Sequence, residues 1–249
     1  MSERVQLGDP LAEAVRIAEA ANRSDVTLRV MGGVAIALRC PSAQHGPLRR
    51  EYHDTDTVGR RGDRHRIGEL FAALGYRADE SFNLLNGQAR LLFHDAAGER
   101  HVDVFLDPLD LCHRLHFAER LDLEERTLSP TDLLLSKLQI VETSRKDLTD
   151  IAALLLDHAV TADDSAINGA HLGRLAADDW GLWRTMTMVL DRASAFAGEL
   201  GDERVAAVVP RRAGELTDAI EEAPKSRRWK LRARLGERKR WYELPEEPD

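Results

Sequence analysis

The segment Thr27-Leu-Arg-Val-Met-Gly-Gly-Val-Ala-Ile-Ala-Leu38 decides the fold of this chain. Its first five residues are rich in strand formers, whereas Val34 to Leu38 is a run of small apolar residues that suits a helix. Gly32-Gly33 stands between the two, and glycine allows the sharp turn that the change requires. The pattern predicts a strand, a glycine turn and a helix whose first N–H groups are free to bind an anion.

Helix and strand patterns continue on both sides of this segment. Leu11 to Asn22 has apolar residues at helical spacing, and Asp63 to Leu74 repeats that spacing until Gly75 ends it. Between them, Cys40 to Leu48 contains the Pro, Ser and Gly of a loop, and Tyr52 to Val58 alternates like a strand. We therefore expect helix, strand, helix, loop, strand and helix in that order.

Three short β-rich runs come next. They are Phe82–Leu85, Arg90–His94 and His101–Leu106, separated by Asn86-Gly87 and by Asp95-Ala-Ala-Gly98. Because both separators are turn sequences, this stretch predicts an antiparallel meander.

The remainder of the chain is helical in pattern. Ser129-Pro130 begins a helix that we expect to reach Glu142, and a second helix is expected from Arg145 to His158. Beyond Asp163 the apolar spacing stays helical. We predict an α+β fold, with a mixed sheet flanked by helices in a domain of residues 1–160 and an all-α region of residues 161–249.

Composition limits the functional classes. The 249 residues are 43% hydrophobic and 31% charged, which is ordinary for a globular protein, and a net charge of −8 has the wrong sign for a general nucleic-acid coat. Two cysteines exclude a disulfide framework, and neither a signal-peptide core near the N-terminus nor an apolar run of about 18 residues occurs. We expect a cytoplasmic protein with no membrane partner.

Three carboxylates carry the predicted chemistry. Asp54 and Asp56 leave the same face of their strand because side chains alternate, and Asp103 shares a face with His101, Phe105 and Asp107 on another strand. If the two strands are neighbours, the three carboxylates converge. Carboxylate oxygens are the ligands that Mg²⁺ prefers, and a pair of such ions can hold the attacking and leaving oxygens of a phosphoryl transfer.

These residues, in this order, resemble the nucleotidyltransferase superfamily, which has the fold of DNA polymerase β. The resemblance covers about residues 26–157 and extends to bacterial small-molecule and abortive-infection toxin-type members. It implies that Gly32 and Gly33 bind nucleotide phosphates, that Asp54 and Asp56 bind metal, and that Asp103 binds metal or accepts a proton. Lys137 resembles a lysine that lies near the triphosphate in the toxin-type members. Relative to that family, Cys40 to Tyr52 is an insertion.

Other residues suggest weaker sites. Arg60 and Arg61 flank the aspartate pair, and arginine forks suit phosphate oxygens, although such residues are often solvated. The run from Cys112 to His116 has too few ligands for zinc. The basic segment Lys225 to Arg240 contains Trp229, and this mixture of charge and aromatic rings can bind RNA or be a solvated helix face.

The sequence thus predicts a nucleotidyltransferase that uses Mg²⁺, through a two-ion site, to move a nucleoside monophosphate from an NTP to an acceptor hydroxyl, with release of pyrophosphate. The acceptor is a small molecule such as an antibiotic, a tRNA end or a protein, and the toxin-type resemblance implies a toxin–antitoxin setting with a possible protein partner. The alternative is a catalytically silent module of the same fold that binds a nucleotide or a partner. A metal-dependent hydrolase fits less well because histidines at ligand spacing are absent.

Overall fold

The computed structural model describes residues 8–96 and 100–244, and the chain forms two compact units. The first contains the described residues up to Arg39, Glu51–Leu109 and Leu115–Ser129, and the second contains Cys40–Arg50, Asp110–Arg114 and the described residues from Pro130 onward. The division thus falls at residue 130, whereas the sequence suggested a boundary near residue 160. The reason is that the two helices after Pro130 pack against the later helices of the chain.

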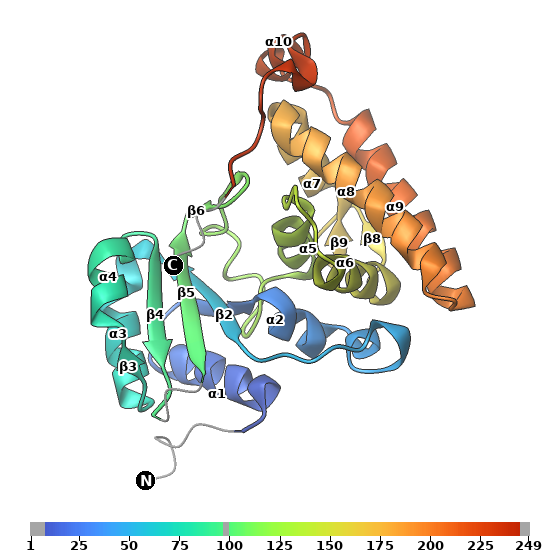
Figure 1. Ribbon diagram of the computed structural model, residues 1–249. Coiled ribbons are helices and arrows are strands. Elements are labelled where there is room, and N and C mark those ends of the chain that lie inside the picture. Colours follow the sequence, from blue (N-terminus) through green and yellow to red (C-terminus); the bar gives the residue numbers. More distant parts are fainter. Residues whose placement is uncertain (1–7, 97–99, 245–249) are drawn as a thin grey trace. The chain divides into compact units, whose positions relative to one another are not determined.

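The first unit is a mixed sheet with helices. Its helices are α1 (Pro10–Arg23), α2 (Gly32–Arg39), α3 (Arg64–Ala73) and α4 (Glu80–Asn86), and its main strands are β1 (Leu28–Met31), β2 (Thr55–Arg60), β3 (Arg77–Ala78), β4 (Arg90–His94) and β5 (His101–Asp107). A short 3-10 turn, Arg61–Asp63, precedes α3. The expected α+β class, with a mixed sheet flanked by helices, is confirmed (Figure 1).

The sheet has the strand order β1-β2-β5-β4-β3. β1 is antiparallel to β2, β2 is parallel to β5, and β4 is antiparallel to both β5 and β3. The outer edge of β1 is covered by the segment before Pro130, since Val30 N–H donates to Arg126 O and Leu128 N–H donates to Val30 O, both at 2.9 Å. The two carboxylate-bearing strands, β2 and β5, are thus neighbours, which meets the condition for their carboxylates to converge.

One face of this sheet forms the hydrophobic core. Val102, Val104 and Leu106 of β5 are buried on that face with Leu91 and Phe93 of β4. Helices α1 and α3 cover them, contributing Ile17, Ala20, Ala21, Ile67, Leu70 and Phe71. The alternate residues of β5 face the other side, as the alternation predicted.

The expected strand at Phe82–Leu85 is wrong, because these residues lie in helix α4. The Asp79 side chain caps the helix by accepting from Phe82 N–H at 2.9 Å. The Asn83 side chain accepts from Leu92 N–H at 2.7 Å and donates to Leu92 O at 3.1 Å, so it takes the place of a strand partner for β4. Gly87 is the C-cap of α4 rather than part of a hairpin turn. The other expected turn, Asp95–Gly98, lies partly outside the described residues.

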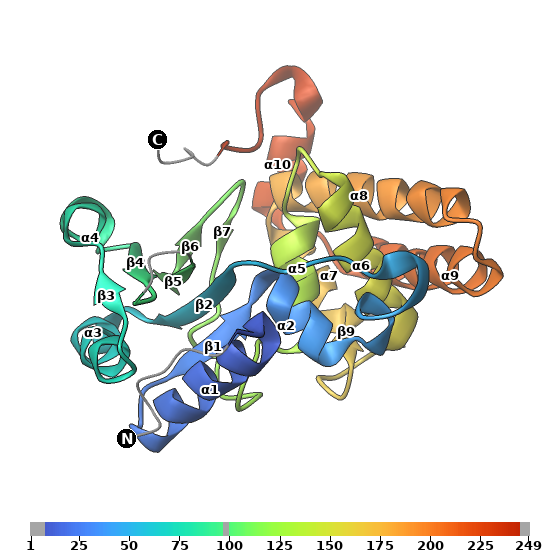
Figure 2. The same cartoon turned by 60° about the horizontal axis from the view of Figure 1, so that its bottom comes forward.

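The second unit is built from helices. They are α5 (Pro130–Leu138), α6 (Arg145–Asp157), α7 (Gly169–Asp178), α8 (Trp180–Glu199), α9 (Glu203–Glu222) and α10 (Arg227–Ala233), with 3-10 turns at Pro41–Ala43, Gly46–Leu48 and Gly236–Arg238. α9 packs against α6, α7 and α8, and Figures 1 and 2 show α8 and α9 side by side. Most begin at a side-chain cap, such as Ser144 for α6 and Asp179 for α8.

The region after residue 160 is helical apart from one small sheet. β8 (Val160–Thr161) pairs in parallel with β9 (Ile167–Asn168). Two further short strands, β6 (Leu109–Asp110) and β7 (Arg114–Leu115), form a two-stranded sheet. Cys40 and Cys112 are both buried and are not in a disulfide.

No helix among the described residues has the length and apolar character needed to cross a membrane.

Candidate functional site

The glycine turn places the start of α2 directly against Asp56. Gly32 has a φ of +67°, a left-handed conformation that side chains rarely adopt, and a Cβ at this position would overlap Oδ2 of Asp56. β1 ends at Met31, which is paired with Asp56 across the antiparallel ladder. The N-terminal end of α2 carries partial positive charge, so this arrangement puts a carboxylate beside an anion-binding helix end.

Asp103 is the next carboxylate in the same row of the sheet. It is in register with Asp56 on the parallel strand pair β2 and β5. Side chains in register on neighbouring strands point to the same face, with the strands about 4.8 Å apart. Asp56 is half-buried and Asp103 is buried, so two carboxylates lie side by side on the face of the sheet opposite the core.

His101 connects Asp103 to the exposed Asp54. Its Nδ1 lies 3.6 Å from Oδ1 of Asp54, and its Nε2 lies 3.4 Å from Oδ2 of Asp103. Asp54 comes just before the first residue of β2, and its side chain is 53% exposed. The structure therefore brings Asp54, Asp56 and Asp103 to one face, with an imidazole between the first and the last.

Arg90 of β4 pairs with Asp103. Its Nε donates to Oδ1 of Asp103 at 2.7 Å, and its guanidinium lies over the rings of Phe105 and Phe82, 4.9 and 5.6 Å from their centroids. Asp103 is almost fully buried while the Arg90 side chain is 30% exposed. The sequence analysis missed this arginine, although antiparallel pairing of the predicted strands 90–94 and 101–106 would have placed it near Asp103.

Within residues 8–96 and 100–244, no group of three or more His, Cys, Asp or Glu side chains is placed to hold a metal ion. On this face, Asp56 and Asp103 are the two carboxylates in register with each other, and Asp54 is directed toward His101. The run from Cys112 to His116 is likewise not part of any such group among these residues.

The two arginines predicted to bind nucleotide lie away from the carboxylates. Arg60 ends β2, four residues or about 13 Å from Asp56 at the usual rise of a strand. Its guanidinium donates to Asp122 Oδ2 at 2.5 Å and to Thr27 Oγ1 at 3.0 Å. Arg61 follows in the exposed 3-10 turn before α3. The structure does not bring either one to Asp56.

Lys137 lies in the second unit, in a network of buried charges. Its Nζ is 2.9 Å from Asp147 Oδ1 and 3.0 Å from Asp150 Oδ2, and Arg50 binds both oxygens of Asp150 at 2.8 Å. Burial acts to lower the pKa of Lys137, but the charges of Asp150 and Asp147 outweigh it and hold that pKa above its ordinary value. Burial acts to raise the pKa of Asp147, and Lys137 together with Ser144 outweighs it and lowers that pKa.

The segment between α2 and β2 belongs to this same network. Residues 40–50 are part of the second unit, where Ser42 N–H donates to Asp157 Oδ2 at 2.8 Å and Arg50 binds Asp150. Both partners are on α6. This segment is therefore fastened to α6.

Comparison of the chain with protein-family models found no matching family, and comparison with curated proteins found no significant relative.

Proposed function

We propose that the first unit is the catalytic centre of a magnesium-dependent nucleotidyltransferase, which moves a nucleoside monophosphate from an NTP to an acceptor hydroxyl and releases pyrophosphate. The contact between Gly32 and Asp56 is the observation that carries the proposal, because it joins a phosphate-binding helix end to a carboxylate pair. The strand–glycine turn–helix, the parallel pairing of β2 with β5 and the positions of the aspartates support the likeness to polymerase β-type nucleotidyltransferases.

The ligand atoms on this face are carboxylate oxygens, the type that magnesium prefers. Mg²⁺ takes oxygen ligands and is commonly held by one or two carboxylates, with substrate phosphates and water completing its shell. Asp56 and Asp103 supply two carboxylates on adjacent strands, and Asp54 supplies a third at the exposed start of β2.

Each residue has a role in this proposal. Gly32 and Gly33 let the triphosphate approach the first N–H groups of α2, while Asp54, Asp56 and Asp103 hold the metal. Magnesium, when bound, neutralises charge on the phosphate oxygens and on the leaving pyrophosphate. The acceptor oxygen forms a bond to the α-phosphorus as the bond to the pyrophosphate oxygen breaks. As the alternative to binding the metal, Asp103 accepts the hydroxyl proton; its Oδ1 is bonded to Arg90, and its Oδ2 lies 3.4 Å from Nε2 of His101.

Two of the basic residues expected to bind nucleotide are left out of this mechanism. Arg60 already donates to Asp122 and Thr27, and Lys137 is paired with the buried Asp150 and the half-buried Asp147. Phosphate charge in this proposal is balanced by the α2 helix end and the metal.

A second candidate is a silent module of the same fold that binds a nucleotide or a partner protein without transfer. The ion pair between Arg90 and Asp103 favours it, since that cation already compensates the buried carboxylate. The two candidates differ in whether nucleotide binding needs magnesium.

Nucleotide transfer is tested with α-labelled NTPs, Mg²⁺ and a cell extract. The wild-type protein is compared with Asp56→Asn, which keeps the side-chain size beside Gly32, and with Glu69→Gln, a control that removes an exposed carboxylate from α3. We expect label from the wild type and from Glu69→Gln, with a loss of at least about 100-fold in Asp56→Asn if a metal ligand is lost. The labelled fraction identifies the acceptor as RNA, protein or small molecule.

Equal labelling by Asp56→Asn contradicts the assignment of the carboxylates. If no label appears and calorimetry shows NTP binding that is independent of Mg²⁺, the silent module is the correct function.

A further inference from the structure

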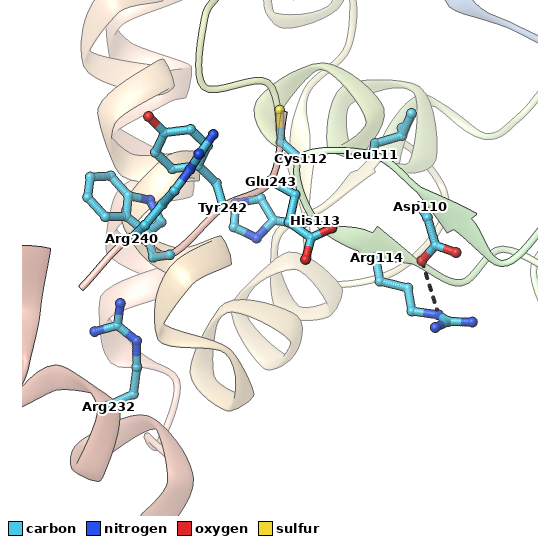
Figure 3. Close-up of a pocket in the computed structure, with 10 residues that line it drawn as sticks. Asp110, Leu111, Cys112, His113, Arg114, Arg232, Arg240, Tyr242 and Glu243 are labelled. Carbon is cyan, nitrogen blue, oxygen red and sulfur yellow. Dashed lines mark ion pairs between the residues drawn. The ribbon is translucent and has the colours of Figure 1, made fainter. Parts of the chain in front are cut away.

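The second unit contains a pocket of about 520 Å³ at its C-terminal segment, which lies within the range of ligand sites. Its wall is formed by the 110–114 turn on one side and by Arg232 and residues 240–243 on the other. Figure 3 shows Arg232, Arg240 and Tyr242 on one side of the pocket, with Asp110 and Arg114 on the opposite side.

Hydrogen bonds and close packing hold the wall of this pocket in place. Trp241 Nε1 donates to Thr185 Oγ1 at 3.1 Å, and the same hydroxyl lies 2.9 Å from Nε2 of the buried His113. Glu243 N–H donates to Cys112 O at 3.1 Å. A Cβ on Gly181 would lie only 2.7 Å from Trp241 O, so the fold keeps a glycine where the C-terminal segment crosses the start of α8.

The charge of the pocket is concentrated on one side. Arg114 pairs with Asp110 at 3.4 Å, so these two charges balance. Arg232 and Arg240 form no ion pair with any carboxylate in the described part of the chain. Arg232 is held in place because it donates to Gly236 O at 2.8 Å and to Lys239 O at 2.6 Å. Arg232 is therefore a fixed positive charge, the exposed Arg240 adds a second, and Glu243 brings one negative charge to the same lining.

Aromatic rings lie beside these charges. Trp241 and Tyr242 pack edge to face with centroids 5.3 Å apart, and Arg240 lies 4.8 Å from the centroid of Tyr242. Aromatic rings and arginine planes are the surfaces on which nucleobases stack, and arginine forks bind phosphate oxygens. Glu243 lines the pocket as well, and its carboxylate disfavours phosphate near itself while offering an acceptor to an amino or hydroxyl group.

We propose that this pocket binds one nucleotide unit, with the phosphate at Arg232 and Arg240 and the base against Trp241 and Tyr242. The unit comes either from a free nucleotide or from the end of a single-stranded nucleic acid, since both present the same base and phosphate. An adjoining pocket of about 290 Å³ shares Arg232 and Trp241 and contains Trp229. It provides room for a second base, which only a longer strand can supply.

Nucleotide binding in this pocket does not depend on the proposed function. The experiment therefore removes the metal and changes a carboxylate of the first unit before binding is measured. The full-length Asp56→Asn variant is titrated in EDTA with AMP, with a single-stranded RNA hexamer and with inorganic phosphate. Tryptophan fluorescence reports binding because all four tryptophans lie in the second unit, and calorimetry gives the affinity.

Arg240→Ala is the decisive variant because this side chain is exposed, so we expect its loss to leave the fold intact, which far-UV circular dichroism checks. Arg238→Ala is the matched control, since it removes the same charge from the same exposed segment without lining the pocket. We expect Arg240→Ala to weaken binding of AMP or RNA about tenfold, as for one charged hydrogen bond, and Arg238→Ala to change it less than twofold.

Tighter binding of RNA than of AMP identifies a strand end as the ligand, and equal binding identifies a free nucleotide. Equal losses in Arg238→Ala and Arg240→Ala overturn the proposal, because they indicate a diffuse basic surface. Failure of AMP and RNA to bind at millimolar concentration, or binding of phosphate as tight as that of AMP, overturns it too.

Discussion

Gly32 and Asp56 are fitted to each other: the left-handed backbone of the glycine leaves space that the Asp56 carboxylate fills. Residue 32 is constrained twice, by its φ of +67° and by the missing Cβ. The glycine turn therefore does more than change direction, because it sets how closely the start of α2 approaches the carboxylate row of the sheet.

Replacing Gly32 by alanine should destabilise the first unit and displace Asp56. The left-handed conformation alone costs about 1–2 kcal/mol in a non-glycine residue, and the overlap with Asp56 adds to that cost. Urea unfolding followed by far-UV circular dichroism measures the loss of stability, and the NTP-labelling assay measures the effect on the site.

Gly68 provides the matched control because it lies inside α3, where an added Cβ meets nothing within 4 Å. Gly68→Ala should stabilise the protein by about 0.5–1 kcal/mol through helix propensity. A Gly32→Ala variant as stable as the wild type would show that the turn tolerates a side chain.

The sequence correctly predicted the strands β2 and β5 at the centre of the first unit, but it did not predict helix α4 at the edge. The alternation in β5 put Asp103 on the face opposite Val102 and Val104, and the register with Asp56 confirms this. Helix α4 was missed because the short apolar run from Phe82 to Leu85 is compatible with either a strand or a helix. What selects the helix is the bonding of Asn83 to Leu92 of β4, a tertiary contact that no local pattern contains.

Asp103 and Arg90 should be energetically coupled. Their ion pair joins a buried carboxylate to a partly exposed guanidinium, so a double-mutant cycle with Asp103→Asn and Arg90→Ala should give a coupling of about 1–2 kcal/mol. Urea unfolding of the four proteins supplies the measurement.

The ion pair between Arg60 and Asp122 serves as the exposed control for this cycle, since its side chains are 39% and 66% exposed. An exposed pair of this kind should give a coupling of only about 0.2–1 kcal/mol. Couplings of equal size in the two cycles would mean that burial of Asp103 does not strengthen its interaction with Arg90.

The stability of the second unit should depend on pH at both extremes because of Lys137 and Asp147. The pKa of Asp147 is lowered by folding, so its contribution is complete above about pH 5 and is lost as pH falls below about 4. The pKa of Lys137 is raised by folding, so its contribution is complete below about pH 10 and is lost as pH rises further. Thermal unfolding monitored by tryptophan fluorescence reports on this unit.

Lys137→Met should remove the alkaline part of this dependence and lower stability at neutral pH by about 3 kcal/mol, because Asp147 loses its cation and the buried Asp150 keeps only Arg50. Lys146→Met is the control, since Lys146 is an exposed lysine on α6, the helix that carries Asp147 and Asp150. An alkaline loss that persists unchanged in Lys137→Met would assign it to another group.

Gly181→Ala should loosen the C-terminal segment. The new Cβ would lie 2.7 Å from Trp241 O, a backbone atom that can move only if the segment moves. We expect faster hydrogen exchange at the Glu243 amide, which is bonded to Cys112 O, and weaker binding of AMP in the neighbouring pocket. Gly198→Ala on the same helix meets nothing within 4 Å and should leave both unchanged. If the Glu243 amide keeps its protection in Gly181→Ala, the close approach of Trp241 is not what holds the segment.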